Sequence, residues 1–255
     1  MLFGVREPDN EEYMNALFSK IISRLNRFLT KRGVSIAYVK PRPVWPGDGS
    51  RFEYQKVHNK FDIQPGATVL DIGSGGDPFP FATVLTDRYI EPTYHRTDRL
   101  KLNGKPFLIS AIECLPFAYK SMDFVFCAHV LEHVDDPIVA CSEIARVGKQ
   151  GYIETPTLGK DMLFGWAKGM HKWHLMSISN KLIFFEYGER ELEGVRSSAW
   201  SDLIFSPYFH PIQELFYQNQ DLFNVMFNWQ DGFKVIVFYL DGRMVQKDFS
   251  SGSII

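Results

Sequence analysis

The stretch Val69-Leu-Asp-Ile-Gly-Ser-Gly-Gly76 decides the fold, because an apolar strand, expected over residues 67–72, runs directly into a turn rich in glycine. Glycine lets the backbone turn sharply and lets a ligand approach the main chain closely. Asp71 has no part to play in an apolar core, and a carboxylate near the carboxyl end of a strand lies where open α/β sheets bind ligands. The glycine turn alone is a weak signal, since many tight turns use glycine.

Apolar runs downstream of this turn predict the rest of a sheet. Candidate strands are Thr83–Thr86, Phe107–Ser110, Asp123–Ala128 and Gly151–Glu154, and a helix is expected over Pro137–Val147. Strands that alternate with helices favour a parallel sheet. We therefore expect the α/β class: a Rossmann-like, mainly parallel sheet with helices on both faces, to which an N-terminal helix and a C-terminal aromatic cap insertion are added.

An amphipathic helix is expected over residues 11–31, where apolar residues recur at helical spacing and Gly33 follows. Its basic residues lie toward the C-terminal half: Lys20, Arg24, Arg27, Lys31 and Arg32. One interpretation is a helix that lies on a membrane surface. The other, which we favour because the apolar stripe alone accounts for the pattern, is a helix packed on the main domain with its basic residues near the negative end of the helix dipole.

The pattern changes beyond Pro156. A hairpin is expected from Trp173–Met176 and Leu182–Tyr187, an aromatic helix from Gln213–Phe227 and a strand from Lys234–Leu240. The segment 157–232 is rich in tryptophan and histidine. Aromatic walls with a few polar groups are typical of a ligand pocket.

Composition argues against several classes of function. The 255-residue chain has a formal net charge of -2, which supplies no general field for nucleic acid. The first residues lack the apolar core of a secretory signal, and no run of about 18 apolar residues predicts a membrane span. Three cysteines without CxxC spacing favour reduced thiols in the cytoplasm. His171 and His174 form only a weak zinc signal, so no metal site is expected.

A further set of motifs follows the glycine turn in a fixed order. It comprises Ala111-Ile-Glu-Cys-Leu-Pro-Phe117, Ser121-Met-Asp-Phe-Val-Phe126, His129-Val-Leu-Glu-His-Val134, Glu143-Ile-Ala-Arg-Val-Gly148 and Gly151-Tyr-Ile-Glu-Thr-Pro156. In this order and spacing the sequence resembles the class I S-adenosylmethionine-dependent methyltransferases, and within them the methyltransferase-11-like subgroup with an LEHV motif. The resemblance covers roughly residues 52–156, and the joint match is far stronger than any single motif.

The resemblance implies a binding site for S-adenosylmethionine at the glycine turn. Gly73, Ser74 and Gly75 are expected to contact the methionine part of this cofactor, and Asp71 to hold its amino group directly or through water. Asp77 takes the place of the third glycine common in the family. The helix that normally follows is therefore expected to be shortened or displaced.

The resemblance also implies an acidic residue that ends the second strand and binds the ribose hydroxyls. Asp87 and Asp98 compete for this role. Only ten residues separate Ile72 from Thr83, which is short for a helical crossover and counts against Asp87. We nevertheless favour Asp87, because the residues before it have strand character and those before Asp98 are too polar for a buried strand.

The adenine is expected to lie against the residues that follow the third strand. Ala111 occupies the place where the family usually has an acidic residue that accepts the adenine amino group. The backbone of Ile112 and Glu113 is expected to face the adenine edge instead, and ring stacking remains available. His129 is a further candidate for lining this pocket.

Candidate catalytic residues come from the LEHV motif. His133 and His129 lie just after the fourth strand, near where the family places the methyl donor. Either could accept a proton from an acceptor hydroxyl or amine, because the pKa of histidine is close to working pH. The competing interpretation is a histidine that hydrogen-bonds the backbone. Glu132 between them is equally interpreted as a solvated or capping carboxylate.

The implied activity is methyl transfer from S-adenosylmethionine to a small-molecule, lipid or glycan acceptor. We interpret the chain, 1–255, as a single methyltransferase domain. Its expected parts are an N-terminal helix and loop (1–50), a cofactor-binding core (51–156), an acceptor-binding cap (157–232), and a C-terminal strand and tail (233–255).

Two other functions compete with methyl transfer. One is a degenerate methyltransferase domain that binds without turnover, which the missing acid at Ala111 favours. The other is a nicotinamide-dependent oxidoreductase, which is disfavoured because Asp77-Pro78 interrupts the GxGxxG pattern. The acceptor atom and the oligomeric state, a homo-oligomer included, are left open.

Overall fold

The computed structural model describes residues 10–34, 51–93, 99–164, 170–188, 199–204, 206 and 210–250. The chain divides into two compact units, Met1–Pro43 with Ser206–His210, and Val44–Phe205 with Pro211–Ile255. Asp98, one of the two candidates for the ribose site, lies outside the described residues.

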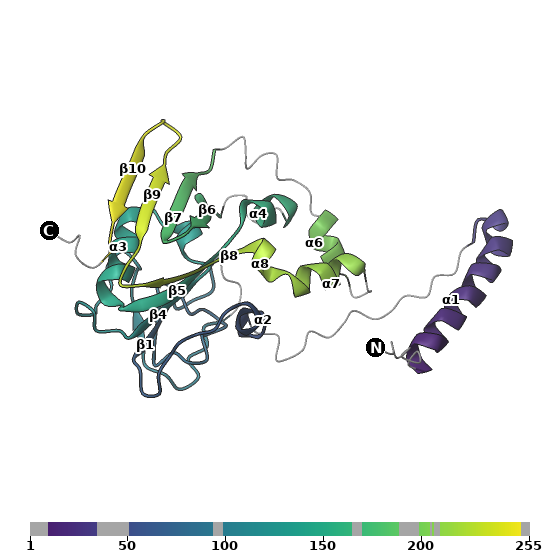
Figure 1. Ribbon diagram of the computed structural model, residues 1–255, viewed down its shortest axis with the longest axis horizontal. Helices are drawn as coiled ribbons and strands as arrows, with labels where there is room; N and C mark the ends of the chain where they lie inside the picture. The colour runs from purple at the N-terminus through teal and green to yellow at the C-terminus, as the bar shows by residue number, and fades with distance from the viewer. Residues whose placement is uncertain are drawn as a thin grey trace, which may run out of the picture. The chain divides into compact units, whose positions relative to one another are not determined.

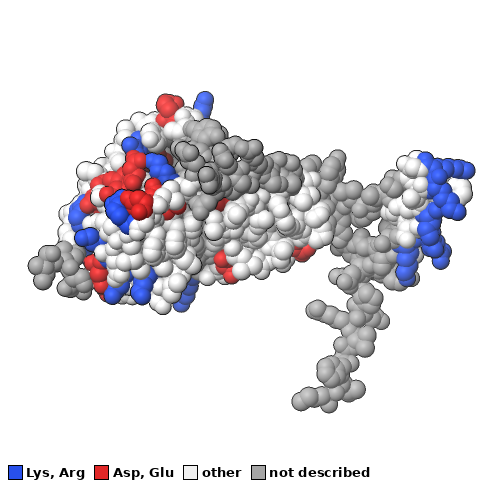
Figure 2. Space-filling view, turned by 90° about the horizontal axis from the view of Figure 1, so that it is seen from above, with Lys and Arg blue, Asp and Glu red and all other residues white. Residues whose placement is uncertain are grey.

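The first unit contains the helix expected near the N-terminus. Helix α1 spans Asn10–Leu29, and a 3-10 turn, η1, spans Thr30–Arg32. Gly33 ends it with a φ of 72°, a left-handed conformation that glycine adopts without strain. Lys and Arg side chains gather on this helix (Figure 2). Both interpretations of its apolar stripe stay predictions, and no helix among the described residues is long and apolar enough to cross a membrane.

A six-stranded sheet forms the centre of the second unit (Figure 1). Its strands, in spatial order, are β3 (Phe107–Ile109), β2 (Val84–Asp87), β1 (Val69–Ile72), β4 (Phe124–Ala128), β5 (Gln150–Pro156) and β8 (Asn224–Gln230). The first five are parallel, and β8 pairs antiparallel with β5. The register places Leu70 opposite Val84 on one side and Val125 on the other. The five predicted strands and the Rossmann-like α/β class are confirmed.

The crossover from β1 to β2, residues 73–83, contains no helix. Phe79, 2% exposed, instead stacks on Phe126 of β4, with 4.1 Å between ring centroids and 6° between ring planes. A parallel crossover that includes a helix needs about a dozen residues or more, so in this short link a buried aromatic ring covers the sheet. The helix expected to be shortened after Asp77 is therefore absent from this crossover.

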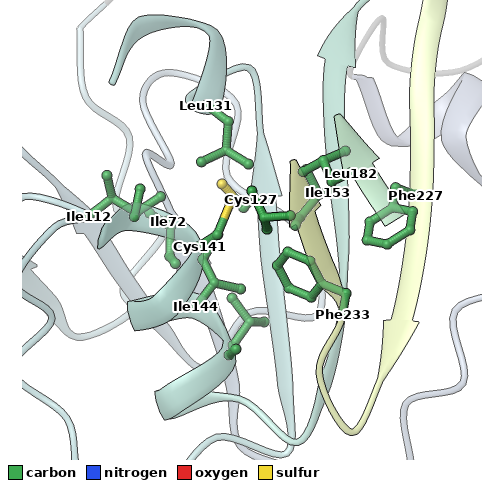
Figure 3. Packing of buried hydrophobic residues seen from close by; sticks show 14 of the residues in the cluster. Ile72, Ile112, Cys127, Leu131, Cys141, Ile144, Ile153, Leu182, Phe227 and Phe233 are labelled. Carbon is green, nitrogen blue, oxygen red and sulfur yellow. The ribbon is translucent and has the colours of Figure 1, made fainter. Parts of the chain in front are cut away.

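Helices cover both faces of the sheet. Helix α3 (Pro137–Val147) packs on one face and is the helix predicted between the last two parallel strands. Figure 3 shows that core, which contains Ile72, Ile112, Cys127, Leu131, Cys141, Ile144, Ile153, Leu182, Phe227 and Phe233. Helix α2 (Arg51–His58) lies on the other face, where Phe52 and Phe61 pack against Phe79.

A second, four-stranded sheet combines the predicted cap with the C-terminal tail. Its order is β10 (Met244–Asp248), β9 (Lys234–Phe238), β7 (Lys181–Glu186) and β6 (Trp173–Ile178). The predicted β6–β7 hairpin is confirmed, and β9 pairs in parallel with β7. The segment 157–232 therefore shares a sheet with the tail that follows it.

The prediction of one helix over Gln213–Phe227 was wrong in its second half. Helices α7 (Pro211–Gln218) and α8 (Gln220–Phe223) are followed by β8, the last strand of the central sheet. In β8 the buried Val225, Phe227 and Trp229 alternate with more exposed residues, the two-residue period of a strand. Pairing along the whole of β5 outweighs the helical pattern of the preceding residues.

The remaining helices form a small cluster of their own. They are α4 (Leu158–Phe164) and α6 (Ala199–Ile204), which pack with α7. The buried side chains at their contact are Phe164, Ile204 and Phe216.

Candidate functional site

A cavity of about 1030 Å³ lies at the carboxyl ends of β1, β2 and β4, which contribute Ile72, Asp87 and Ala128 to its lining. Residues 170–173 and 186–187 also line it. Ligands of open α/β sheets bind at this edge. Part of the predicted acceptor-binding segment thus lines the same space as the predicted cofactor-binding residues.

The glycine turn forms one end of the cavity. Gly73 and Gly75 have φ angles of 68° and 54°, in the left-handed region that side chains disfavour. A Cβ on Gly73 would lie 2.4 Å from Cγ2 of Val130, so the packing also demands glycine there. Both glycines line the cavity. Ser74 between them is fully buried and does not line it.

Asp87 ends β2 and lines the cavity beside this turn. Its Oδ2 accepts a hydrogen bond from the N–H of Gly75 at 3.2 Å, and its Oδ1 accepts one from the N–H of Tyr89 at 2.9 Å. The carboxylate is therefore held at the position expected of a ribose-binding acid. The comparison with Asp98 stays a prediction, because Asp98 is not described.

Asp71 does not line the cavity. It is 2% exposed, and its Oδ2 accepts a hydrogen bond from the N–H of Phe79 at 2.8 Å. Burial raises the pKa of this carboxyl to about 7, against the opposing effects of the Phe79 N–H and of the positive charges of Arg51 and Lys105. Asp71 thus holds the loop that follows the glycine turn, and its predicted role at the cofactor's amino group stays a prediction.

Ile112 and Glu113 line the cavity, as expected of residues at the adenine edge. Two motif residues of α3 hold the loop that carries them. Glu143 accepts a hydrogen bond from the N–H of Leu115 at 2.8 Å, and Arg146 donates to the carbonyl of Leu115 at 2.9 Å. Glu143 and Arg146 therefore hold this loop in place and are not ligand-binding groups.

His129 lines the cavity, and its two ring nitrogens each face a buried carboxylate. Its Nδ1 lies 3.4 Å from Oε1 of Glu132, and its Nε2 lies 3.1 Å from Oε1 of Glu154. Glu154 also accepts hydrogen bonds from Tyr54 and Tyr152. With both ring nitrogens engaged, His129 fits a structural role better than that of a base.

His133 lines the cavity beside a residue of the predicted cap. Its ring is 4.8 Å from that of His171, centroid to centroid, at 74°. His133 Nδ1 lies 2.9 Å from the carbonyl oxygen of Met170. His171 Nδ1 lies 2.9 Å from Oδ2 of Asp161, which also accepts a hydrogen bond from the Tyr187 hydroxyl at 2.8 Å.

The buried carboxylate of Glu132 faces both of these histidines. Burial by itself raises the pKa of Glu132, but the hydrogen bond with His129 and the charges of His133 and His171 lower it to about 2. Burial by itself lowers the pKa of His171, but the hydrogen bond to Asp161 and the charge of Glu132 outweigh it, so this pKa is raised. This end of the cavity therefore holds a carboxylate among three imidazoles.

Sequence patterns did not single out Arg51, Asp161 or Tyr187. Arg51 lines the cavity, and its backbone N–H and its Nε donate to Oδ2 of Asp77 at 2.8 and 3.3 Å. None of the three belongs to a motif: Arg51 begins α2, Asp161 lies in α4 and Tyr187 follows β7. Only the pairing of distant elements brings these side chains to the site.

Residues 70–153 match the family model described as a methyltransferase domain. The resemblance to the class I methyltransferases is confirmed over this stretch. The methyltransferase domain so defined includes the glycine turn, Asp87 and the LEHV motif. No curated protein sequence matches the chain.

Three solved structures are similar to this chain. A protein from Pyrococcus horikoshii OT3 is 18% identical, with 57% of this chain and 78% of that chain covered and a TM-score of 0.38. A SAM-dependent methyltransferase from Aquifex aeolicus is 20% identical, with 41% and 64% covered and a TM-score of 0.31. One from Thermotoga maritima is 25% identical, with 38% and 46% covered and a TM-score of 0.29, so the chain spans less than half of its length. With TM-scores this low, residue roles rest on the geometry of the present chain.

Proposed function

We propose that the chain transfers the methyl group of S-adenosylmethionine to a small-molecule, lipid or glycan acceptor. The observation that carries the proposal is one cavity that the glycine turn and Asp87 line together with His133 and His171. Ligand cavities measure roughly 300–1,000 Å³. One of about 1030 Å³ has room for a cofactor at one end and an acceptor at the other.

The residues at the glycine-turn end fit S-adenosylmethionine. The absence of side chains at Gly73 and Gly75 lets a ligand reach the backbone, and the Asp87 carboxylate can accept hydrogen bonds from a pair of ribose hydroxyls. The loop at Ile112 and Glu113 supplies an edge for the adenine. When bound, this cofactor supplies a sulfonium methyl group that needs no protein nucleophile.

The other end of the cavity has the chemistry to bind and deprotonate an acceptor. Transfer needs the acceptor atom in line with the methyl group and the sulfur. The wall that can orient the acceptor in this way contains Met170, His171 and Tyr187. His133 lines the same space and can take a proton from a hydroxyl or amine. His129 is less suited, since carboxylates engage both of its ring nitrogens.

Calorimetry with S-adenosylmethionine and S-adenosylhomocysteine tests the cofactor part of the proposal. Saturable binding of either ligand is expected, with NAD as the control that should give no heat. Binding of NAD alone would favour the oxidoreductase. Tight binding of S-adenosylmethionine, without methyl transfer to any member of a broad acceptor panel, would favour the binding module.

A further inference from the structure

Three side chains, of which His133 and His171 line the cavity and Glu132 is buried beside them, are arranged as metal ligands. Glu132, His133 and His171 each offer one ligand atom, and these atoms all lie within 4.8 Å of one another. Glu132 and His133 belong to the 3-10 turn η2 (Leu131–His133), and His171 precedes β6. The spacing in the sequence had paired His171 with His174 instead, which left the pair without a third ligand.

Oxygen acceptors fix the orientation of both histidines. The carbonyl oxygen of Met170 can only accept, so the proton of His133 is on Nδ1, 2.9 Å away. The Asp161 carboxylate lies 2.9 Å from Nδ1 of His171 and holds the proton there in the same way. The lone pair of each ring is then on Nε2. This arrangement, an imidazole that donates Nδ1–H to an oxygen and presents Nε2, is the usual one for metal-binding histidines.

Glu132 has one carboxylate oxygen without a hydrogen-bond partner among the described residues. This oxygen is Oε2, and the side chain is 1% exposed. Its Oε1 lies 3.8 Å from Nε2 of His133. A buried carboxylate oxygen without a partner is costly, and a cation bound between the three residues would satisfy it.

Backbone contacts hold the two halves of the cluster together. The N–H of Lys172 donates to the carbonyl of Glu132 at 2.7 Å. The indole N–H of Trp173 donates to the carbonyl of Val134 at 2.8 Å. These two bonds join the residues that follow His171 to the segment that contains Glu132 and His133. The fold therefore brings the three ligand residues together before an ion binds.

We propose that Glu132, His133 and His171 bind a first-row divalent transition-metal ion at the acceptor end of the cavity. Two imidazoles and a carboxylate are ligands that zinc, cobalt and manganese accept and that magnesium and calcium do not prefer. Ligand atoms around a tetrahedral zinc lie about 3.3 Å apart, so the bound ion draws the three groups together.

The site goes beyond the proposed methyl transfer and deepens it. His133 and His171 line the cavity, so the open coordination positions of the ion face the acceptor. A bound divalent ion lowers the pKa of a hydroxyl that coordinates it. His133 Nε2 is then a ligand, and the ion rather than His133 would make the acceptor hydroxyl more acidic. The hydroxyl proton would pass to solvent water, and the methyl group would move from the sulfonium sulfur to the acceptor oxygen, leaving S-adenosylhomocysteine.

The test uses the full chain, without an affinity tag and stripped of metal by a chelator. Titration with CoCl₂, followed by visible absorption, should show one bound ion per chain, which ZnCl₂ displaces and MgCl₂ does not. Glu132→Gln and His171→Ala should each weaken Co²⁺ binding at least 10-fold. Asp161→Asn should weaken it by roughly 10- to 100-fold, because the orientation of His171 is lost.

His174→Ala is the matched control, since His174 lies on β6 three residues after His171 and does not line the cavity. It should leave Co²⁺ binding unchanged. Far-ultraviolet circular dichroism checks that each variant is folded, and anomalous diffraction from wild-type crystals grown with CoCl₂ locates the ion without any variant.

Several outcomes would overturn the proposal. The wild type would fail to bind Co²⁺ stoichiometrically, or the folded variants Glu132→Gln and His171→Ala would bind Co²⁺ as tightly as the wild type. An anomalous peak away from the three residues would have the same consequence. Calorimetry with S-adenosylhomocysteine on the same samples separates this failure from that of the proposed function, because cofactor binding does not require the ion.

Discussion

The Asp87 carboxylate accepts a hydrogen bond from the backbone N–H of Gly75, with 3.2 Å between Oδ2 and the nitrogen. This bond ties the end of β2 to the turn that follows β1. The crossover between these strands has no helix, so the bond between Asp87 and Gly75 helps to position the turn. The two residues that are expected to face the cofactor therefore also hold each other in place.

Replacement of Gly75 by valine should abolish cofactor binding in a folded protein. The φ of 54° is strained for any side chain and more so for a branched one, and Gly75 itself lines the cavity. We expect the affinity for S-adenosylhomocysteine to fall at least roughly 100-fold by calorimetry, about 2.7 kcal/mol.

Gly66→Val is the control for Gly75→Val. Gly66 has a φ of 81°, a Cβ at this position would meet no atom within 4 Å, and the residue does not line the cavity. The variant should show a similar loss of stability with unchanged affinity. Equal affinities for Gly75→Val and the wild type would remove the turn from the site.

Asp87→Ala should weaken cofactor binding by roughly 10- to 100-fold. A hydrogen bond to a charged group contributes about 1.5–3 kcal/mol, and the ribose would lose such bonds. Asp87→Asn removes the charge and keeps one oxygen acceptor, enough for the N–H of Gly75 or that of Tyr89 but not for both. Affinity that is higher in Asp87→Asn than in Asp87→Ala would measure the contribution of that remaining bond. The parallel variant is Asp98→Ala. A loss confined to that variant would transfer the ribose role to Asp98.

Asp71→Asn should remove a pH dependence from stability. The folded-state pKa of about 7 is above the ordinary value of 3.8. The folded protein therefore holds this proton more tightly than the unfolded chain, and the contribution of Asp71 to stability falls as pH rises from about 4 to about 7. Three pKa units correspond to up to about 4 kcal/mol.

Urea unfolding at pH 5 and at pH 8 measures this effect. Asparagine can still accept the hydrogen bond from the N–H of Phe79, so the variant should match or exceed the wild type in stability at pH 8. Its loss of stability between the two pH values should be smaller. The same loss in both proteins would show that Asp71 is already ionised below pH 5.

His171→Ala should separate acceptor chemistry from cofactor binding. His171 lines the cavity from the 170–173 segment and not from the predicted cofactor-binding residues, so the affinity for S-adenosylhomocysteine should change by less than about twofold. Methyl transfer to the acceptor should fall by roughly 100-fold or more, since the residue holds either the acceptor or the ion beside it. Loss of cofactor affinity, or a change of mass in light scattering with normal turnover, would contradict this division of the cavity.

Local sequence patterns were sufficient to predict the parallel strands of the central sheet. The strands β1, β4 and β5 are short apolar runs bounded by turn residues. In α3 the apolar residues recur at helical spacing, and Asp136 and Pro137 mark the start of the helix. Strand β8 was missed because its residues follow two short helices without a break. Its alternation becomes decisive only when β5 lies beside it.

The sequence by itself determined the class of the fold, the glycine turn and the acid that ends β2, because each depends on residues next to one another in the chain. Only the tertiary structure decided that Asp71 is buried against the N–H of Phe79 and does not line the cavity, and that His129 is held between two carboxylates. It also decided that Asp161 and Tyr187 gather behind His171, and that His171 meets Glu132 and His133. The physical reason is that burial and partner geometry set the role of a polar side chain, and both depend on elements that are distant in sequence.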